Sequence, residues 1–160
     1  ETLTNSRKDS ITLDQEVKTL KNYIEVERLM ASTDFKHTIN VQSDLDPEEV
    51  LIPPMLIQPF VENAIRHGIM PLQRVGELNI TFKTDTNFLY ATITDNGIGI
   101  QQSQQNKPKT DHQSMALQVT KERIESLAGS NTLQIKDISQ KDTDISGTQI
   151  SFKIPLETEF

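Results

Sequence analysis

The chain has no cysteine and no tryptophan among its 160 residues, and only 5% of its residues are aromatic. The lack of cysteine excludes disulfides and thiolate metal sites, and it is compatible with a cytosolic location. Basic residues are also few, since 16 Lys and Arg stand against 23 Asp and Glu for a net charge of −7. A nucleic-acid surface needs a basic stripe, often with stacking aromatics, so this composition argues against direct nucleic-acid binding.

Long apolar runs are absent as well. No stretch reaches the roughly 18 apolar residues of a membrane-spanning helix, and no charged-then-apolar signal segment opens the chain. The polar start, ETLTNSRKDS, has no initiator Met and suggests an excised fragment. A length of 160 residues is enough for one domain with a sizeable core. We expect a linker from a missing upstream segment over residues 1–11, the domain over 12–156 and a tail over 157–160.

The helical pattern recurs in three places. It predicts helices over residues 12–30, 58–68 and 114–128. Thr12 and Gln15 have the spacing of a capping box at the start of the first helix. Pro54 suits the first turn of the second helix, and Gly129 is placed to end the third as a C-cap.

Alternation of apolar and polar residues marks the strands. It predicts five strands, at residues 35–41, 78–82, 89–93, 132–138 and 147–154. The second and third form a hairpin joined by the turn TDTN, and Asp95 stands at the end of the third strand. His37 lies alone on the first strand, where we interpret it as structural.

The stretch QPFVENAIRHG, residues 58–68, places four polar side chains on one side of a helix. Glu62, Asn63, Arg66 and His67 occupy the arc opposite the apolar stripe. A solvated polar face is the ordinary interpretation of such a pattern. Asn is a poor helix former, however, and a carboxamide beside a Glu suits coordination better than solubility.

Two glycine-containing stretches form the next candidates. In DNGIGI, residues 95–100, the glycines let a ligand approach the main chain, and Asp95 could accept a hydrogen bond from an exocyclic amine. Asn-Gly also occurs in simple hairpin turns, but a polar loop follows it here. That loop, residues 101–113, has almost no apolar content, which is typical of a functional lid or a disordered stretch. The later GTQISFKIP, residues 147–155, is a weaker signal.

The order of these pieces resembles the ATP-binding domain of sensor histidine kinases, the Bergerat-type or GHKL fold shared with type II topoisomerases, Hsp90 and MutL. IPPMLIQPFVENAIRHG resembles the N-box of the LytS/YehU-type kinases, and TLDQEVKTLKNYIEVERLM resembles the helix just upstream of it. The resemblance covers roughly residues 12–155. It implies a two-layer α/β (α+β) sandwich with a mixed sheet of about five strands on three helices, and an ATP lid over 101–113.

The resemblance assigns catalytic and phosphate-binding roles to the second helix. Asn63 would bind the Mg²⁺ that bridges the nucleotide phosphates, because a hard cation prefers oxygen ligands. Glu62 would orient or deprotonate the attacking group, or hold metal-bound water. Arg66 and His67 match a basic pair that lies near the phosphates.

The same resemblance assigns the adenine end of the site. Asp95 would accept the adenine amino hydrogen, and Thr148 would complete the contact through a water molecule. Gly97 and Gly99 would frame the adenine pocket and the hinge of the lid. The remaining members of the implied ATP-binding set are Ile100 and Leu117.

One departure from the family pattern concerns the lid. Ser114 and Ala116 stand where a second glycine motif usually wraps the phosphates, and positive dihedrals are costly for them. We therefore expect looser phosphate binding, helped by Lys107, Lys109 or His112, although residues of this kind are more often simply solvated loop residues.

The implied function is donation of the ATP γ-phosphoryl to a histidine and then to a response regulator, of the DNA-binding kind. No histidine precedes His37, so the phosphoacceptor would belong to an upstream helical segment, and this fragment alone would not phosphorylate itself. We expect a monomeric cytoplasmic domain of a homodimeric bacterial inner-membrane protein. Two alternatives stay open: a degenerate, non-catalytic module for protein interaction, and an ATPase of the Hsp90 or MutL kind.

Overall fold

The computed structural model describes residues 9–31, 34–72, 74–100 and 111–158, with the backbone alone described over 111–114. Most of the predicted lid, with Lys107 and Lys109, therefore lies outside the described residues. The same holds for the side chains of His112 and Ser114.

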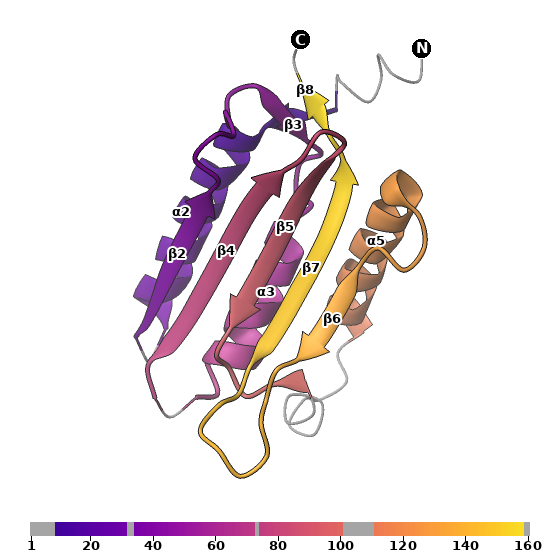
Figure 1. The fold of residues 1–160 in the computed structure, drawn as a ribbon. Coiled ribbons are helices and arrows are strands. Elements are labelled where there is room, and N and C mark those ends of the chain that lie inside the picture. Colours follow the sequence, from indigo (N-terminus) through magenta and orange to yellow (C-terminus); the bar gives the residue numbers. More distant parts are fainter. Residues whose placement is uncertain (1–8, 32–33, 73, 101–110, 159–160) are drawn as a thin grey trace.

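A mixed five-stranded sheet forms one layer of the molecule (Figure 1). Its strands, in spatial order, are β2 (Phe35–Val41), β4 (Gly76–Thr84), β5 (Phe88–Asp95), β7 (Thr148–Pro155) and β6 (Gln134–Asp137). Only the β2–β4 pair is parallel, and the other three pairs are antiparallel. All five predicted strands are confirmed, as is the β4–β5 hairpin, with ends that differ by a few residues.

The helices cover one face of this sheet (Figure 1). They are α2 (Leu13–Met30), α3 (Gln58–Asn63) with its π-helical continuation η1 (Ala64–Ile69), and α5 (Asp111–Ala128). The predicted capping box is confirmed, because Gln15 N donates to Thr12 Oγ1 at 3.1 Å and Thr12 N to Gln15 Oε1 at 3.0 Å. Gly129 ends α5 as predicted, with φ of +100° and its N–H donating to Glu125 O at 2.8 Å.

The second helix begins at residue 58 as predicted, but Pro54 does not lie in its first turn. Helical structure begins at Gln58, and Pro59 rather than Pro54 occupies the first turn. Between them Met55 has φ of +63°, a left-handed conformation that ends any helix begun at Pro54. The helix also widens after Asn63, where Met70 N donates to Ile65 O across five residues.

A second, three-stranded sheet was not among the predicted elements. It consists of β1 (Ile11–Thr12), β3 (Val50–Ile52) and β8 (Glu157–Thr158), in the order β1-β3-β8. Strands of two or three residues are too short to show an alternation in sequence. The ordered fold thus extends to Ile11 and Thr158, while the division into linker, domain and tail otherwise stays a prediction.

The core lies between the large sheet and the helices. The inward faces of β4 and β5 are buried in alternation, as the pattern of two predicts. Phe60 of α3 packs on Phe152 of β7, with ring centroids 5.9 Å apart. This packing fixes α3 over the middle of the sheet. Over the described ranges, no helix is long and apolar enough to cross a membrane.

Candidate functional site

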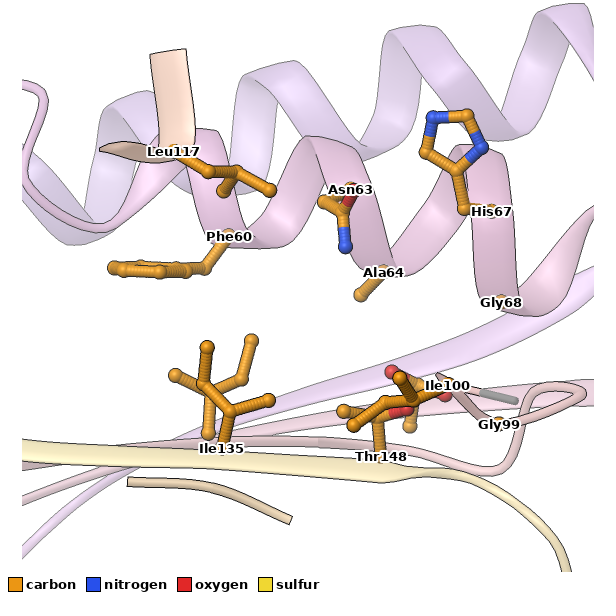
Figure 2. A pocket seen from close by; sticks show the side chains of 12 residues that line it. Phe60, Asn63, Ala64, His67, Gly68, Gly99, Ile100, Leu117, Ile135 and Thr148 are labelled. Atoms are coloured by element: carbon orange, nitrogen blue, oxygen red, sulfur yellow. The ribbon is translucent and has the colours of Figure 1, made fainter. Parts of the chain in front are cut away.

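A cavity of about 250 Å³ lies between the α3–η1 helix and the ends of β5, β6 and β7 (Figure 2). The helix supplies one wall, the sheet supplies the opposite wall, and Leu117 of α5 also contributes to the lining. The lining residues are Phe60, Asn63, Ala64, His67, Gly68, Asp95, Gly99, Ile100, Leu117, Ile135, Thr148 and Ile150.

Seven of the ten residues implied by the sequence motifs meet in this cavity. They are Asn63, His67, Asp95, Gly99, Ile100, Leu117 and Thr148. In Figure 2 the Asn63 side chain points from the helix toward the sheet, whereas the ring of His67 extends the other way. Glu62, Arg66 and Gly97 do not line it. The structure brings distant motifs together, and the role of each residue stays a prediction.

Asp95 is the buried charge of the site, with 4% of its surface exposed. It ends β5 directly opposite Thr148, the first residue of β7. Its Oδ1 accepts a hydrogen bond from Gly97 N at 2.8 Å, and the backbone N–H of Thr148 also donates to the carboxyl. Burial, with a smaller contribution from the charge of Asp137, raises the pKa of Asp95 to about 6 against these bonds. Such a carboxylate is an acceptor for a ligand that reaches the sheet end.

Gly97 serves the site from behind the cavity wall. A Cβ at Gly97 would lie 2.3 Å from the backbone carbon of Gly68, and Ile98 N donates to Gly68 O at 3.0 Å. The 95–100 loop therefore lies directly against the η1 backbone. Gly97 makes this approach possible although it does not itself line the cavity, and its role at the adenine pocket and lid hinge stays a prediction. Gly99 does line the cavity, with φ of +89°.

Asp137 anchors the segment that precedes residue 101, and the sequence reasoning missed it. Its Oδ2 accepts from Ile100 N at 3.0 Å, and its Oδ1 accepts from Ser139 N at 2.9 Å. It pairs with Thr148 across β6 and β7. An acidic residue at the end of the predicted 132–138 strand was the available signal, but only the pairing shows that this end lies beside Gly99.

A second cavity, of about 220 Å³, continues past Asn63. It is lined by Met55, Gln58, Pro59, Glu62, Asn63, Ala116 and Leu117. Asn63 and Leu117 line both cavities, so Asn63 stands at their junction. Glu62 lies one residue away on the wall of the second cavity. Ala116, one of the two substitutes for the missing glycines, faces the same space.

Arg66 contacts α2 rather than either cavity. Its Nη2 lies 3.2 Å from Glu27 Oε1, and its Nη1 lies 3.1 Å from Glu62 Oε1. The side chain of Glu27 is largely buried, while that of Arg66 is about half exposed. The predicted place near a ligand's phosphates would therefore require Arg66 to leave Glu27.

A protein-only metal centre is not present in the described part of the chain, where no three His, Asp or Glu side chains cluster. The Asn63 carboxamide and the adjacent Glu62 carboxylate nevertheless offer oxygen donors at the cavity junction. Mg²⁺ commonly takes one or two protein oxygens and completes its shell with water and phosphate. The donor set therefore fits a magnesium ion that arrives with a phosphorylated ligand.

A mixed sheet with helices on one face, and a cavity bounded by an Asn-bearing helix and a buried Asp at a strand end, defines an ATP-binding domain of the Bergerat type. The model of the family described as histidine kinase-, DNA gyrase B-, and HSP90-like ATPase matches residues 54–158, and the chain belongs to this family. Histidine kinases are one of the three classes of ATPase that the description of this family names.

Sequence relatives carry sensor-kinase names. The chain is 28% identical over 162 residues to the sensor protein LytS of Bacillus subtilis, covering 97% of this chain and 26% of that protein. It is 32% identical over 99 residues to the sensor histidine kinase/phosphatase LytS of Staphylococcus aureus, covering 61% of this chain and 17% of that protein. The chain thus spans about a quarter or less of these relatives.

Solved structures share the fold at low sequence identity. The Acinetobacter baumannii histidine kinase AdeS matches with a TM-score of 0.59 and 17% identity, covering 92% of this chain and 66% of that one. The catalytic domain of histidine kinase ThkA matches with a TM-score of 0.59 and 17% identity, covering 91% of this chain and 95% of that one. This similarity confirms the two-layer α/β fold.

Proposed function

We propose that this domain binds ATP with the adenine in the first cavity and the phosphates directed toward the second. In the parent protein the γ-phosphoryl would pass to a histidine outside this chain, and then to an aspartate of a DNA-binding response regulator. The observation that carries the proposal is the buried Asp95 at the strand end, bounding a cavity that shares Asn63 and Leu117 with a second cavity.

The adenine end combines one charged acceptor with apolar walls. Asp95 uses Oδ1 for Gly97 N, and a carboxylate has lone pairs left for a second donor. The adenine amino group supplies such a donor, and Thr148 lies opposite, close enough in register to share a bridging water. Phe60, Ile135 and Ile150 offer apolar surface for the ring. This arrangement favours a base with an exocyclic amine.

The phosphate end places oxygen donors at the cavity junction. Asn63 would hold Mg²⁺ through its carboxamide oxygen, and the ion would neutralise phosphate charge. A bound cation also lets a protein of net charge −7 accept a polyanion. Glu62 would orient or deprotonate the attacking group, or hold metal-bound water. His67 and, after release from Glu27, Arg66 would lie near the phosphates, and the guanidinium of Arg66 would add positive charge there.

The wider setting is part of the same proposal. The parent would be a homodimeric, bacterial inner-membrane kinase with this domain, itself monomeric, on the cytoplasmic side. Its phosphoacceptor helical segment would lie upstream of residue 12. Phosphoryl transfer depends mainly on positioning and charge stabilisation, so the acceptor histidine must reach the γ-phosphate at the second cavity.

Titration calorimetry with a non-hydrolysable ATP analogue, with and without Mg²⁺, tests the proposal. We expect micromolar to submillimolar binding that weakens without Mg²⁺.

Asp95→Asn should lower the affinity by roughly tenfold or more, because an amide turned toward the adenine amine loses a charge-assisted hydrogen bond. Asn63→Ala should remove most of the Mg²⁺ dependence. Asp44→Asn, at an exposed turn, is the matched control and should bind as the wild type does.

Ala116 favours one alternative, a degenerate module that keeps the fold for protein interaction. It lines the second cavity where the family pattern has glycine. Absence of detectable binding by the wild-type chain would contradict the proposed function and favour this alternative. Restoring glycine at Ser114 and Ala116 together would then show whether these positions are the cause.

A further inference from the structure

Glu16 is a carboxylate inside the apolar core. It lies on the buried face of α2 among Leu13, Val17 and Leu20, and only 1% of its surface is exposed. One of its oxygens, Oε2, has no hydrogen-bond partner in the described part of the chain. Burial raises the pKa of Glu16 above its ordinary value. A charged group in such a place needs compensating contacts.

The compensating contacts come from the start of α3. The backbone N–H groups of Ile57 and Leu56 donate hydrogen bonds to the Glu16 carboxyl. Helix α3 begins at Gln58 with Ile57 as its N-cap, and no side chain from its own sequence caps it. The first N–H groups of any helix lack partners within the helix. Glu16 therefore supplies from α2 the acceptor that α3 itself does not provide.

Helix α5 joins the same junction through Arg123. The charge of Arg123 acts on Glu16 and favours its ionised form. Its Nη2 also donates to Pro54 O at 3.1 Å, on the segment leading into α3. Glu16 and Arg123 together thus connect α2, the start of α3 and α5.

Two of these helices form walls of the cavities. Asn63 follows the capped end of α3 by about a turn and a half, and Leu117 lies on α5 about a turn and a half before Arg123. Both side chains line both cavities. The opposite wall is held separately, by strand pairing.

We propose that Glu16 is a positioning residue for the nucleotide site, which sets Asn63 relative to Leu117 by holding the start of α3 and, through Arg123, helix α5. This inference rests on the proposed ATP site. It makes nucleotide affinity depend on a residue that touches no ligand and lies outside both cavities.

Three variants of the whole chain test the inference. Glu16→Leu fills the buried space without an acceptor, Glu16→Gln keeps an acceptor of the same shape, and Glu25→Gln removes a half-exposed charge from the same helix. The measurements are the Kd for a non-hydrolysable ATP analogue with Mg²⁺, unfolding by urea, and nitrogen–proton NMR spectra. The NMR signals of interest are the Asn63 side-chain amide and the backbone amides of Ile57 and Leu117.

We expect Glu16→Leu to raise the Kd for the ATP analogue about tenfold, which is the equivalent of one lost hydrogen bond. The same variant should shift the NMR signals of Asn63 and Leu117. Glu16→Gln should restore most of the affinity, and Glu25→Gln should match the wild type. A Glu16→Leu chain with wild-type affinity and an unmoved Asn63 signal would overturn the inference, whatever its stability.

A second variant covers the case in which Glu16→Leu does not fold. If Glu16→Leu is unfolded, Arg123→Gln takes its place, because it removes the contact of α5 with Pro54 O at the same junction. Wild-type affinity and unmoved Asn63 and Leu117 signals in Arg123→Gln would then overturn the inference. If the wild-type chain binds no nucleotide, the proposed function fails, and the ligand-free Asn63 and Leu117 signals of the Glu16 variants still decide the positioning role.

Discussion

Asp95 is a buried carboxyl group, with only 4% of the residue's surface exposed to solvent. Its folded-state pKa of about 6 lies above the ordinary value of 3.8, so the folded chain favours the protonated form. The contribution of this group to stability is therefore fully present below pH about 4 and is lost as the pH rises through about 6. At neutral pH the ionised side chain costs folding free energy, at most about 3 kcal/mol for a shift of this size.

Asp95→Asn should therefore stabilise the nucleotide-free chain at pH 8. Asparagine keeps an oxygen for Gly97 N and removes the buried charge, so we expect a gain of about 1–3 kcal/mol in the free energy of unfolding. The gain should shrink toward zero near pH 4. Urea unfolding at both pH values measures it, with Asp44→Asn as the exposed control. An equal difference between wild type and variant at both pH values would argue against a raised pKa.

The sequence predicted those site residues that lie in a local motif. It did not predict contacts between residues that only the fold brings together. Asn63, Asp95 and Thr148 each lie in a short sequence motif that indicates a role, and all three line the same cavity. The Arg66–Glu27 ion pair links residues 39 apart, and no periodicity relates them. Glu16 was visible only as a charged residue within an apolar helical stripe, which solvent exposure explains more often than burial.

At the scale of elements, the contact between the η1 backbone and the 95–100 loop holds the site together. It depends on two glycines facing each other, Gly68 and Gly97. A Cβ at Gly68 would lie 2.9 Å from Asp95 Oδ1, so the helix also closes over the carboxyl. The position of Asp95 follows from how closely the loop approaches the helix.

Gly97→Ala should disturb this contact. The new methyl would lie 2.3 Å from the Gly68 backbone, so the loop must move away, with an expected loss of about 1–3 kcal/mol of stability and weaker nucleotide binding. Gly129→Ala is the control, because its Cβ meets nothing within 4 Å, although φ of +100° makes it strained. We expect the control to lose stability without losing affinity. Calorimetry on both variants decides, and unchanged affinity in Gly97→Ala would contradict the role given to this contact.

Element type was predictable where a period persists for several residues. The five strands of the large sheet and the three helices all show it. The π-helical turn at Ala64–Ile69 could not be predicted from the sequence, because six residues do not distinguish a π turn from an α turn. The strands β1, β3 and β8 have two or three residues each, and their pairing depends on tertiary contacts alone.

At the scale of the whole molecule, binding is a more direct observable than phosphorylation. The chain spans 26% of LytS from Bacillus subtilis, and the proposed phosphoryl acceptor lies outside it. A ligand that binds only the folded state stabilises it in proportion to the logarithm of its concentration over Kd. The stability of the domain therefore reports nucleotide binding without any partner protein.

Saturation with the ATP analogue and Mg²⁺ should raise the melting temperature. At 100 times Kd the stabilisation is about 2.7 kcal/mol. For a domain of this size, that corresponds to a shift of roughly 5–10 °C. The shift should be much smaller without Mg²⁺, because the charge of −7 then opposes a polyanion, and smaller in Asp95→Asn at the same ligand concentration. Thermal unfolding followed by circular dichroism measures it. An equal shift with free triphosphate would mean that the phosphates alone bind, and would remove Asp95 and the first cavity from the proposed site.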